Sequence, residues 1–167
     1  PILDGHIKGP DALFALIKNY LISLNIEEAT QLLFVADGAH WIWNRVSKLR
    51  DELGLGPSKT YELIDFYHAV EHLGQVANLR KKWTAKQRKT WFQKHRRLLL
   101  KGKSEQVIIA VKAICRGRNG KAIATQRDYF IRNQYRMDYA KIKNLNLPIG
   151  SGAIESAIRR VINQRVK

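Results

Sequence analysis

The feature that most constrains the fold is QLLFVAD, a continuous apolar run of strand length that ends in Asp37. An uninterrupted run of this kind is typical of a strand buried on both faces of a sheet. Helical patterns lie on either side of it, over residues 11–26 and 40–56, and a second strand pattern covers residues 60–68. The sequence therefore predicts an α/β fold in which neighbouring strands are parallel.

The character of the chain changes after these elements. Residues 69–147 show helical periodicity without a convincing strand, and LNLPIGSG then breaks the pattern before a final helix over 152–167. Residues 1–9 are typical of a short strand with a glycine turn. We therefore expect three parts: an α/β part over 1–68, a basic helical insertion over 69–147, and a final segment over 148–167.

Charge is distributed unevenly along the chain. Residues 1–71 hold 6 lysines and arginines against 10 acidic residues, whereas residues 72–167 hold 24 against 4. The net charge of +16 indicates a polyanionic partner, with nucleic acid first and an acidic membrane surface second. No apolar run reaches the roughly 18 residues that a membrane span needs. Cys115 is the only cysteine, which excludes an intrachain disulfide and fits a reducing cytosol.

The most basic stretch runs from Arg80 to Lys103, with 11 lysines and arginines and no acidic residue. Trp83, Trp91 and Phe92 are interleaved with these cations. Such rings can stack on unpaired bases. Packing in a helical core is the more frequent role of aromatic residues, and it is favoured here.

Two aspartates stand where predicted strands end. Asp37 and Asp65 would meet at one edge if their strands share a parallel sheet, because ligand chemistry in such sheets gathers at the carboxyl ends of the strands. Gly38 is expected to let the backbone turn sharply there. Paired carboxylates suit Mg²⁺. Alternatively, Asp37 caps the helix that begins at His40, and Asp65 caps one that begins at Ala69.

The segment HAVEH, His68 to His72, matches the H-x-x-E-H pattern of zinc peptidases, in which two histidines bind zinc and Glu71 is the base. The pattern specifies only three positions, so chance matches are common. A basic arm has no role in peptide hydrolysis. In the alternative, His68 orients a carboxylate and His72 lies on a helix face.

Glu155 stands near the start of the predicted final helix, in GSGAIESAIRR. It either complements the helix dipole and pairs with Arg159, or it supplies a third carboxylate. In the second case, Arg159 and Arg160 flank it and hold phosphates.

Three stretches, ADGAHWIWNRV, DFYHAVEHL and LPIGSGAIESAIRRVINQRVK, together resemble bacterial insertion-sequence transposases of the DDE type, in the Mutator-like branch. The resemblance covers nearly all of the chain. It implies a truncated RNase H-like sheet with flanking helices, a large all-α insertion, and a two-metal site for Mg²⁺ or Mn²⁺.

The resemblance also assigns roles to residues. Asp37 matches the second catalytic aspartate and Glu155 the catalytic glutamate, both as metal ligands. Asp65 and His68 match a signature near the active site. The first catalytic aspartate belongs on an earlier strand, and Asp4 is taken as a hairpin residue instead. We therefore expect the first strands to be missing and the fragment to be inactive alone.

The expected activity is DNA strand cleavage by water, followed by attack of a 3′-hydroxyl on target DNA. The full-length protein is expected to form a homo-oligomer. Its expected location is the bacterial cytoplasm, at the nucleoid when active. A zinc peptidase and a non-catalytic basic nucleic-acid-binding module are the alternatives. The cations expected to contact DNA are Arg80, Lys81, Lys82, Lys86, Arg88, Lys89, Arg96, Arg97, Arg159 and Arg160.

Overall fold

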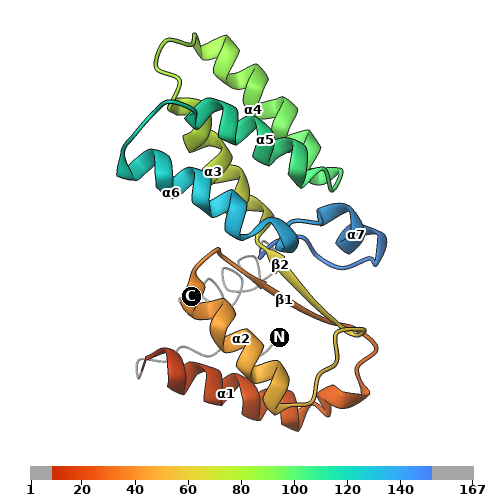
Figure 1. Cartoon of the computed structure of the whole chain (residues 1–167). Helices are drawn as coiled ribbons and strands as arrows, with labels where there is room; N and C mark the ends of the chain where they lie inside the picture. The colour runs from red at the N-terminus through yellow and green to blue at the C-terminus, as the bar shows by residue number, and fades with distance from the viewer. Residues whose placement is uncertain (1–8, 152–167) are drawn as a thin grey trace, which may run out of the picture. The chain divides into compact units, whose positions relative to one another are not determined.

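The computed structural model describes residues 9–151 (Figure 1). The predicted first strand over 1–9 therefore lies almost entirely outside the described residues. The predicted final helix, with Glu155, Arg159 and Arg160, also lies outside them. Contacts divide the described chain into two compact units. The strand–helix unit comprises residues 9–34, 39–62 and 151, and the helical unit comprises residues 35–38 and 63–150.

The sheet of the described residues has two strands, β1 (Leu32–Ala36) and β2 (Thr60–Ile64). Leu32 N donates to Lys59 O at 2.8 Å, and Asp65 N donates to Ala36 O at 2.8 Å. Residue numbers rise together along the two strands, so the pair is parallel. The predicted α/β class with parallel neighbours is confirmed, whereas the RNase H-like topology stays a prediction.

The expected burial of β1 on both faces is wrong, because all five of its residues are only half-buried. In the described part of the chain, β1 has a neighbouring strand on one side only. Strand β2 is more deeply buried, with Leu63 and Ile64 almost inaccessible to solvent.

In the strand–helix unit, α1 (Pro10–Ser23) packs on α2 (His40–Glu52), and a short 3-10 helix, η1 (Ile26–Glu28), follows α1. Trp43, Val46 and Leu49 form the buried face of α2 at a spacing of three residues. Trp43 is 4% exposed and Trp41 is 44% exposed, as expected for two residues two positions apart on a helix.

The helical unit contains α3 (Phe66–Asn78), α4 (Ala85–Leu100), α5 (Ser104–Cys115), α6 (Lys121–Arg132), η2 (Gln134–Arg136) and α7 (Tyr139–Asn144). Helices α3 to α6 lie side by side around a shared core (Figure 1). Its fully buried side chains include Leu73, Val76, Leu99, Val107, Val111, Phe130 and Met137. The predicted helical character of this region is confirmed.

The second predicted strand is too long at its carboxyl end. Strand β2 ends at Ile64, and α3 begins at Phe66 rather than at Ala69. The reason is local: Asp65 Oδ1 accepts hydrogen bonds from Tyr67 N and His68 N, which starts the helix at once. The division between the two compact units falls within β1 and β2. The three parts expected from the sequence stay a prediction.

Candidate functional site

Asp37 and Asp65 stand at the same edge of the parallel strand pair. The hydrogen bond from Asp65 N to Ala36 O (2.8 Å) joins the last residue of β1 to the residue that follows β2. Asp37 is therefore the residue that directly follows the acceptor of this bond, and Asp65 is the donor. Both residues belong to the helical unit, so the two aspartates follow paired strand ends within a single compact unit.

Asp65 is mainly a helix cap. The residue is 7% exposed, and Oδ1 accepts from Tyr67 N at 2.8 Å and from His68 N at 3.3 Å. The capping alternative is thus correct in kind, with a helix start three residues earlier than expected. The same geometry connects Asp65 to the backbone of His68.

Asp37 is half-buried, and it is not the N-cap residue of α2. That position belongs to Ala39, which has no side-chain oxygen, so the predicted capping role of Asp37 is wrong at this position.

The chain leading to residue 151 passes beside Asp65. Phe66 N donates to Ile149 O at 3.0 Å, and a Cβ at Gly150 would lie 3.3 Å from Asp65 Oδ1. The backbone that leads toward Glu155 thus runs against this cap, while Glu155 itself lies outside the described residues.

Gly38 is needed for space and not for an unusual backbone angle. Its φ lies outside the left-handed region. A Cβ there would collide with Tyr129 Cε2 and would lie 2.7 Å from Asn133 Nδ2. The expected reason for a glycine, a sharp turn, is therefore replaced by the close approach of α6.

Tyr129 lies near both aspartates. Burial raises the pKa of its hydroxyl, and the charges of Asp37, Asp65 and Glu71 raise it further. The sequence analysis assigns no role to Gln126, Tyr129 or Asn133. Their spacing of three and four residues places Gln126 and Tyr129 on one face of α6 and the C-cap residue Asn133 in line with them.

The two histidines of the H-x-x-E-H segment have different surroundings. His72 Nδ1 is 2.6 Å from Gln126 Oε1, and the ring is stacked on Tyr129 at 3.6 Å. Burial lowers the pKa of His72, and the hydrogen bond to Gln126 partly opposes this. His68 Nδ1 is 3.8 Å from Glu71 Oε2 on an exposed surface. Across residues 9–151, no three histidine, cysteine, aspartate or glutamate side chains lie close enough together to hold a metal ion.

The cations predicted to contact DNA fall into two groups. Lys81, Lys82, Lys86, Lys89 and Arg97 are exposed. Arg80, Arg88 and Arg96 are half-buried and make contacts within the protein. The guanidinium of Arg80 lies 5.5 Å from the centre of the Trp83 ring, that of Arg96 lies 5.4 Å from the centre of the Phe66 ring, and Arg88 Nη1 donates to Arg80 O at 3.4 Å.

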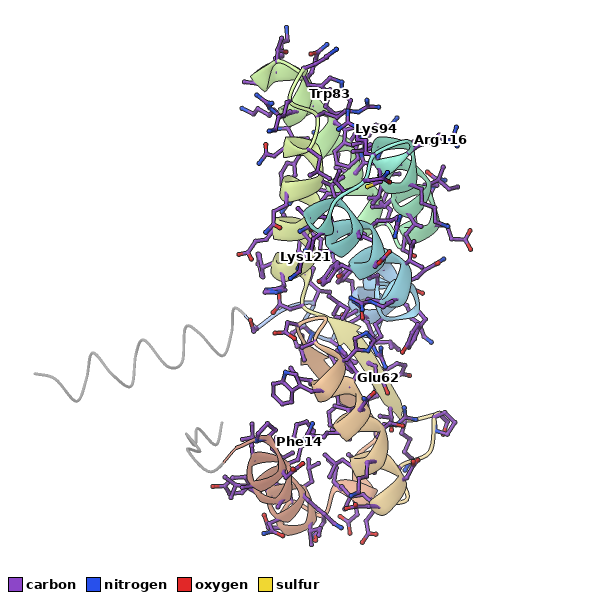
Figure 2. All side chains as sticks on the ribbon, turned by 60° about the vertical axis from the view of Figure 1, so that its left-hand side comes forward. Phe14, Glu62, Trp83, Lys94, Arg116 and Lys121 are labelled. Carbon is purple, nitrogen blue, oxygen red and sulfur yellow. The ribbon has the colours of Figure 1, made fainter. Side chains whose placement is uncertain are left out.

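The aromatic rings of the basic stretch pack mainly on one another. Trp91 lies 6.3 Å from Trp83 and 4.0 Å from His95, between ring centres. His95 Nδ1 donates to Trp91 O at 2.6 Å. Phe92 faces Gly74 of α3, where an added Cβ would lie 3.9 Å from Phe92 Cε2. This favours the packing interpretation of these rings. Figure 2 shows Trp83 and Lys94 toward one end of the helical unit, with Arg116 and Lys121 at the ends of α5 and α6.

None of the protein families, curated proteins or solved structures with which the chain was compared matches it.

Carboxylates such as those at the strand edge are the kind of ligand that Mg²⁺ or Mn²⁺ takes. Mg²⁺ uses one or two carboxylates and keeps several waters, which suits Asp37 with Asp65 beside it. Zinc at an H-x-x-E-H site needs both histidines and a third protein ligand. The hydrogen bond between His72 Nδ1 and Gln126 leaves Nε2 as the ring nitrogen that a metal could use.

Proposed function

We propose that this chain is the catalytic part of a DDE-type transposase with an RNase H-like core, and that it cleaves and joins DNA by metal-assisted phosphoryl transfer. The observation that carries the proposal is the hydrogen bond from Asp65 N to Ala36 O, which aligns Asp37 and Asp65 at the carboxyl ends of parallel strands. The approach of Ile149 and Gly150 to Asp65 supports it, because this backbone continues toward Glu155.

In the proposed site, Asp37 and Glu155 hold Mg²⁺ or Mn²⁺ through carboxylate oxygens. Asp65 and His68 are supporting residues, since the cap orients the start of α3 next to Asp37. The bound metal supplies polarisation of the phosphate and a lower pKa for the attacking oxygen.

Two in-line displacements follow from the proposal. First, water attacks a phosphorus at the transposon end, the P–O3′ bond breaks, and the 3′-hydroxyl is released. That hydroxyl then attacks a target phosphorus and displaces a 3′-oxygen of the target strand. Each attacking oxygen loses a proton and each leaving oxygen gains one.

The helical unit has the charge that such a substrate requires. It holds 20 lysines and arginines against 6 aspartates and glutamates. The proposed partners are transposon-end and target DNA, with a homo-oligomer of the full-length protein at the bacterial nucleoid. Within residues 9–151, no helix has the length and apolar character to cross a bilayer.

A nicking assay on supercoiled plasmid tests this function, using the protein encoded by the complete open reading frame. With Mn²⁺ or Mg²⁺ we expect nicking that Asp37→Asn lowers by at least about a hundredfold, whereas Asp51→Asn, an exposed aspartate of α2, leaves it unchanged. DNA binding without nicking in the unsubstituted protein would contradict the proposal and favour the non-catalytic binding module.

A further inference from the structure

The backbone next to Asp37 rests on a tyrosine of α6. A Cβ at Gly38 would collide with Tyr129 Cε2 and would come within 3.0 Å of Cδ2. Asn133 Nδ2 occupies the remaining space, 2.7 Å from the same Cβ position. Only glycine leaves room for this approach, so the position of the ring determines where the residue after Asp37 can lie.

Tyr129 is itself held from several sides. The residue is 5% exposed, and its ring is stacked on the His72 ring of α3, with 3.6 Å between ring centres and 18° between planes. His72 Nδ1 is 2.6 Å from Gln126 Oε1, and Gln126 Nε2 donates to Gln75 Oε1 at 2.6 Å. Asn133 Nδ2 donates to Tyr129 O at 2.9 Å. Contacts with side chains of α3 and α6 thus hold the Tyr129 ring in place against Gly38.

The Tyr129 hydroxyl takes no part in these contacts. It is buried and has no hydrogen-bond partner among the described residues. Burial and the nearby carboxylates of Asp37 and Asp65 raise its pKa, so it stays a neutral phenol at neutral pH. The support given to Gly38 therefore comes from the ring.

We propose that Tyr129 is a positioning residue for Asp37. The ring, stacked on His72, packs against Gly38 and fixes the position of its backbone, and this in turn sets the direction of the Asp37 carboxylate. This inference rests on the proposed function, in which that carboxylate binds a divalent metal. In known metal sites, replacing a residue that orients a metal ligand lowers the metal affinity by about 10 to 100-fold.

The test is a Mn²⁺ titration of the ¹⁵N-labelled 167-residue chain, followed by paramagnetic broadening of the Gly38 amide signal. Tyr129→Leu removes the ring, and we expect it to weaken Mn²⁺ binding by about tenfold or more. Tyr129→Phe keeps the ring and is expected to restore the affinity to within about twofold of the unsubstituted chain. Tyr135→Leu, a 69% exposed tyrosine of η2, is the matched control and should leave the affinity unchanged.

Gly38→Ala provides a second variant that leaves the buried ring intact. It should weaken Mn²⁺ binding because its Cβ meets Tyr129, and its effect should shrink in the Tyr129→Leu background, as expected for two residues in contact. A folded Tyr129→Leu variant with unchanged Mn²⁺ affinity would overturn the proposal. Equal losses in the Leu and Phe variants would also overturn it, because the hydroxyl would then be the active group.

A metal-free measurement separates this proposal from the proposed function. The Tyr129 ring should shift the Gly38 Hα signals by its ring current, and this shift should vanish in Tyr129→Leu and remain in Tyr129→Phe. If these shifts behave as expected but the unsubstituted chain shows no Mn²⁺ effect at Gly38, the contact between the Tyr129 ring and Gly38 is supported and the metal function is contradicted. If the ring-current shift is absent from the unsubstituted chain, the contact between the Tyr129 ring and Gly38 is contradicted.

Discussion

Asp65 combines two roles that the sequence presents as alternatives. Its carboxylate caps α3 through Tyr67 N and His68 N, and its backbone N–H closes the strand pair on Ala36. The cap determines where α3 begins. The hydrogen bond from Asp65 N to Ala36 O places the start of this helix beside the end of β1. The backbone of Asp65, and not its carboxylate, is therefore the part that is bonded to the residue before Asp37.

We predict that Asp65→Ala destabilises the protein by about 1 to 2 kcal/mol, as loss of an N-cap does. Chemical denaturation measures this directly. Glu71→Ala, an exposed residue on the same helix, is the control and should change the unfolding free energy by less than about 0.5 kcal/mol. A loss in Asp65→Ala no larger than in the control would refute the capping role.

Two half-buried or buried histidines give the protein a predictable pH response. Burial lowers the pKa of both His72 and His95 below the ordinary value of 6.5. In the unfolded chain these rings take up protons as the pH falls below about 6.5, while the folded protein resists protonation. The unfolded state then binds more protons, so the unfolding free energy decreases as the pH falls from 6.5 toward the lower folded pKa.

Denaturation at pH 7.5 and at pH 5.5 tests this response. We expect a lower unfolding free energy at pH 5.5, and a smaller difference between the two pH values in His95→Gln. An identical difference in His95→Gln would show that the ring at position 95 does not contribute.

At the scale of elements, α4 shows how local sequence determines a helix start. Thr84 Oγ1 accepts from Gln87 N at 3.2 Å, and Thr84 N donates to Gln87 Oε1 at 2.8 Å. This capping box begins the helix whose Leu99 enters the core of the helical unit.

Thr84→Ala should lower the thermal midpoint, because the lost cap costs about 1 kcal/mol. The matched control is Thr90→Ala, an exposed position on the outside of the same helix. Alanine has the higher helix propensity, so Thr90→Ala should leave stability unchanged or raise it slightly. A lower midpoint in the control than in Thr84→Ala would contradict the capping box.

The sequence predicts these elements well where the information is local. Apolar periodicity identifies α1, α2 and both strands, and the order of strands and helices predicts the parallel pair. The burial of β1 does not follow from its apolar run, because burial depends on which elements cover a strand. The stacking of Tyr129 on His72 and its contact with Gly38 could not be predicted. The three residues are far apart in the sequence and meet only when α6 packs against α3 and against the end of β1.

For the whole molecule, the distribution of charge is the property that bears most directly on the proposed DNA binding. The helical unit carries the excess of lysine and arginine, and its exposed cations include Lys81, Lys82, Lys86 and Lys89. Binding to duplex DNA should weaken steeply with salt, because each phosphate neutralised releases condensed counterions.

Replacing these four lysines by alanine should reduce the salt dependence of DNA binding. Each lost phosphate contact lowers the slope of log K against log salt by about 0.9. Lys48→Ala with Lys59→Ala, two exposed positions of the strand–helix unit, is the control and should leave the slope unchanged. Fluorescence anisotropy with a labelled duplex measures both slopes, and equal slopes in the two variants would contradict this DNA-binding surface.

The most direct test of the central claim is a crystal structure of the protein soaked with Mn²⁺, with the metal located by anomalous scattering. The proposed function predicts an anomalous peak bound by carboxylate oxygens of Asp37 and Glu155, at about 2.0 to 2.3 Å. Carboxylates of Asp37 and Glu155 that lie more than about 10 Å apart, with no metal bridging them, would contradict it.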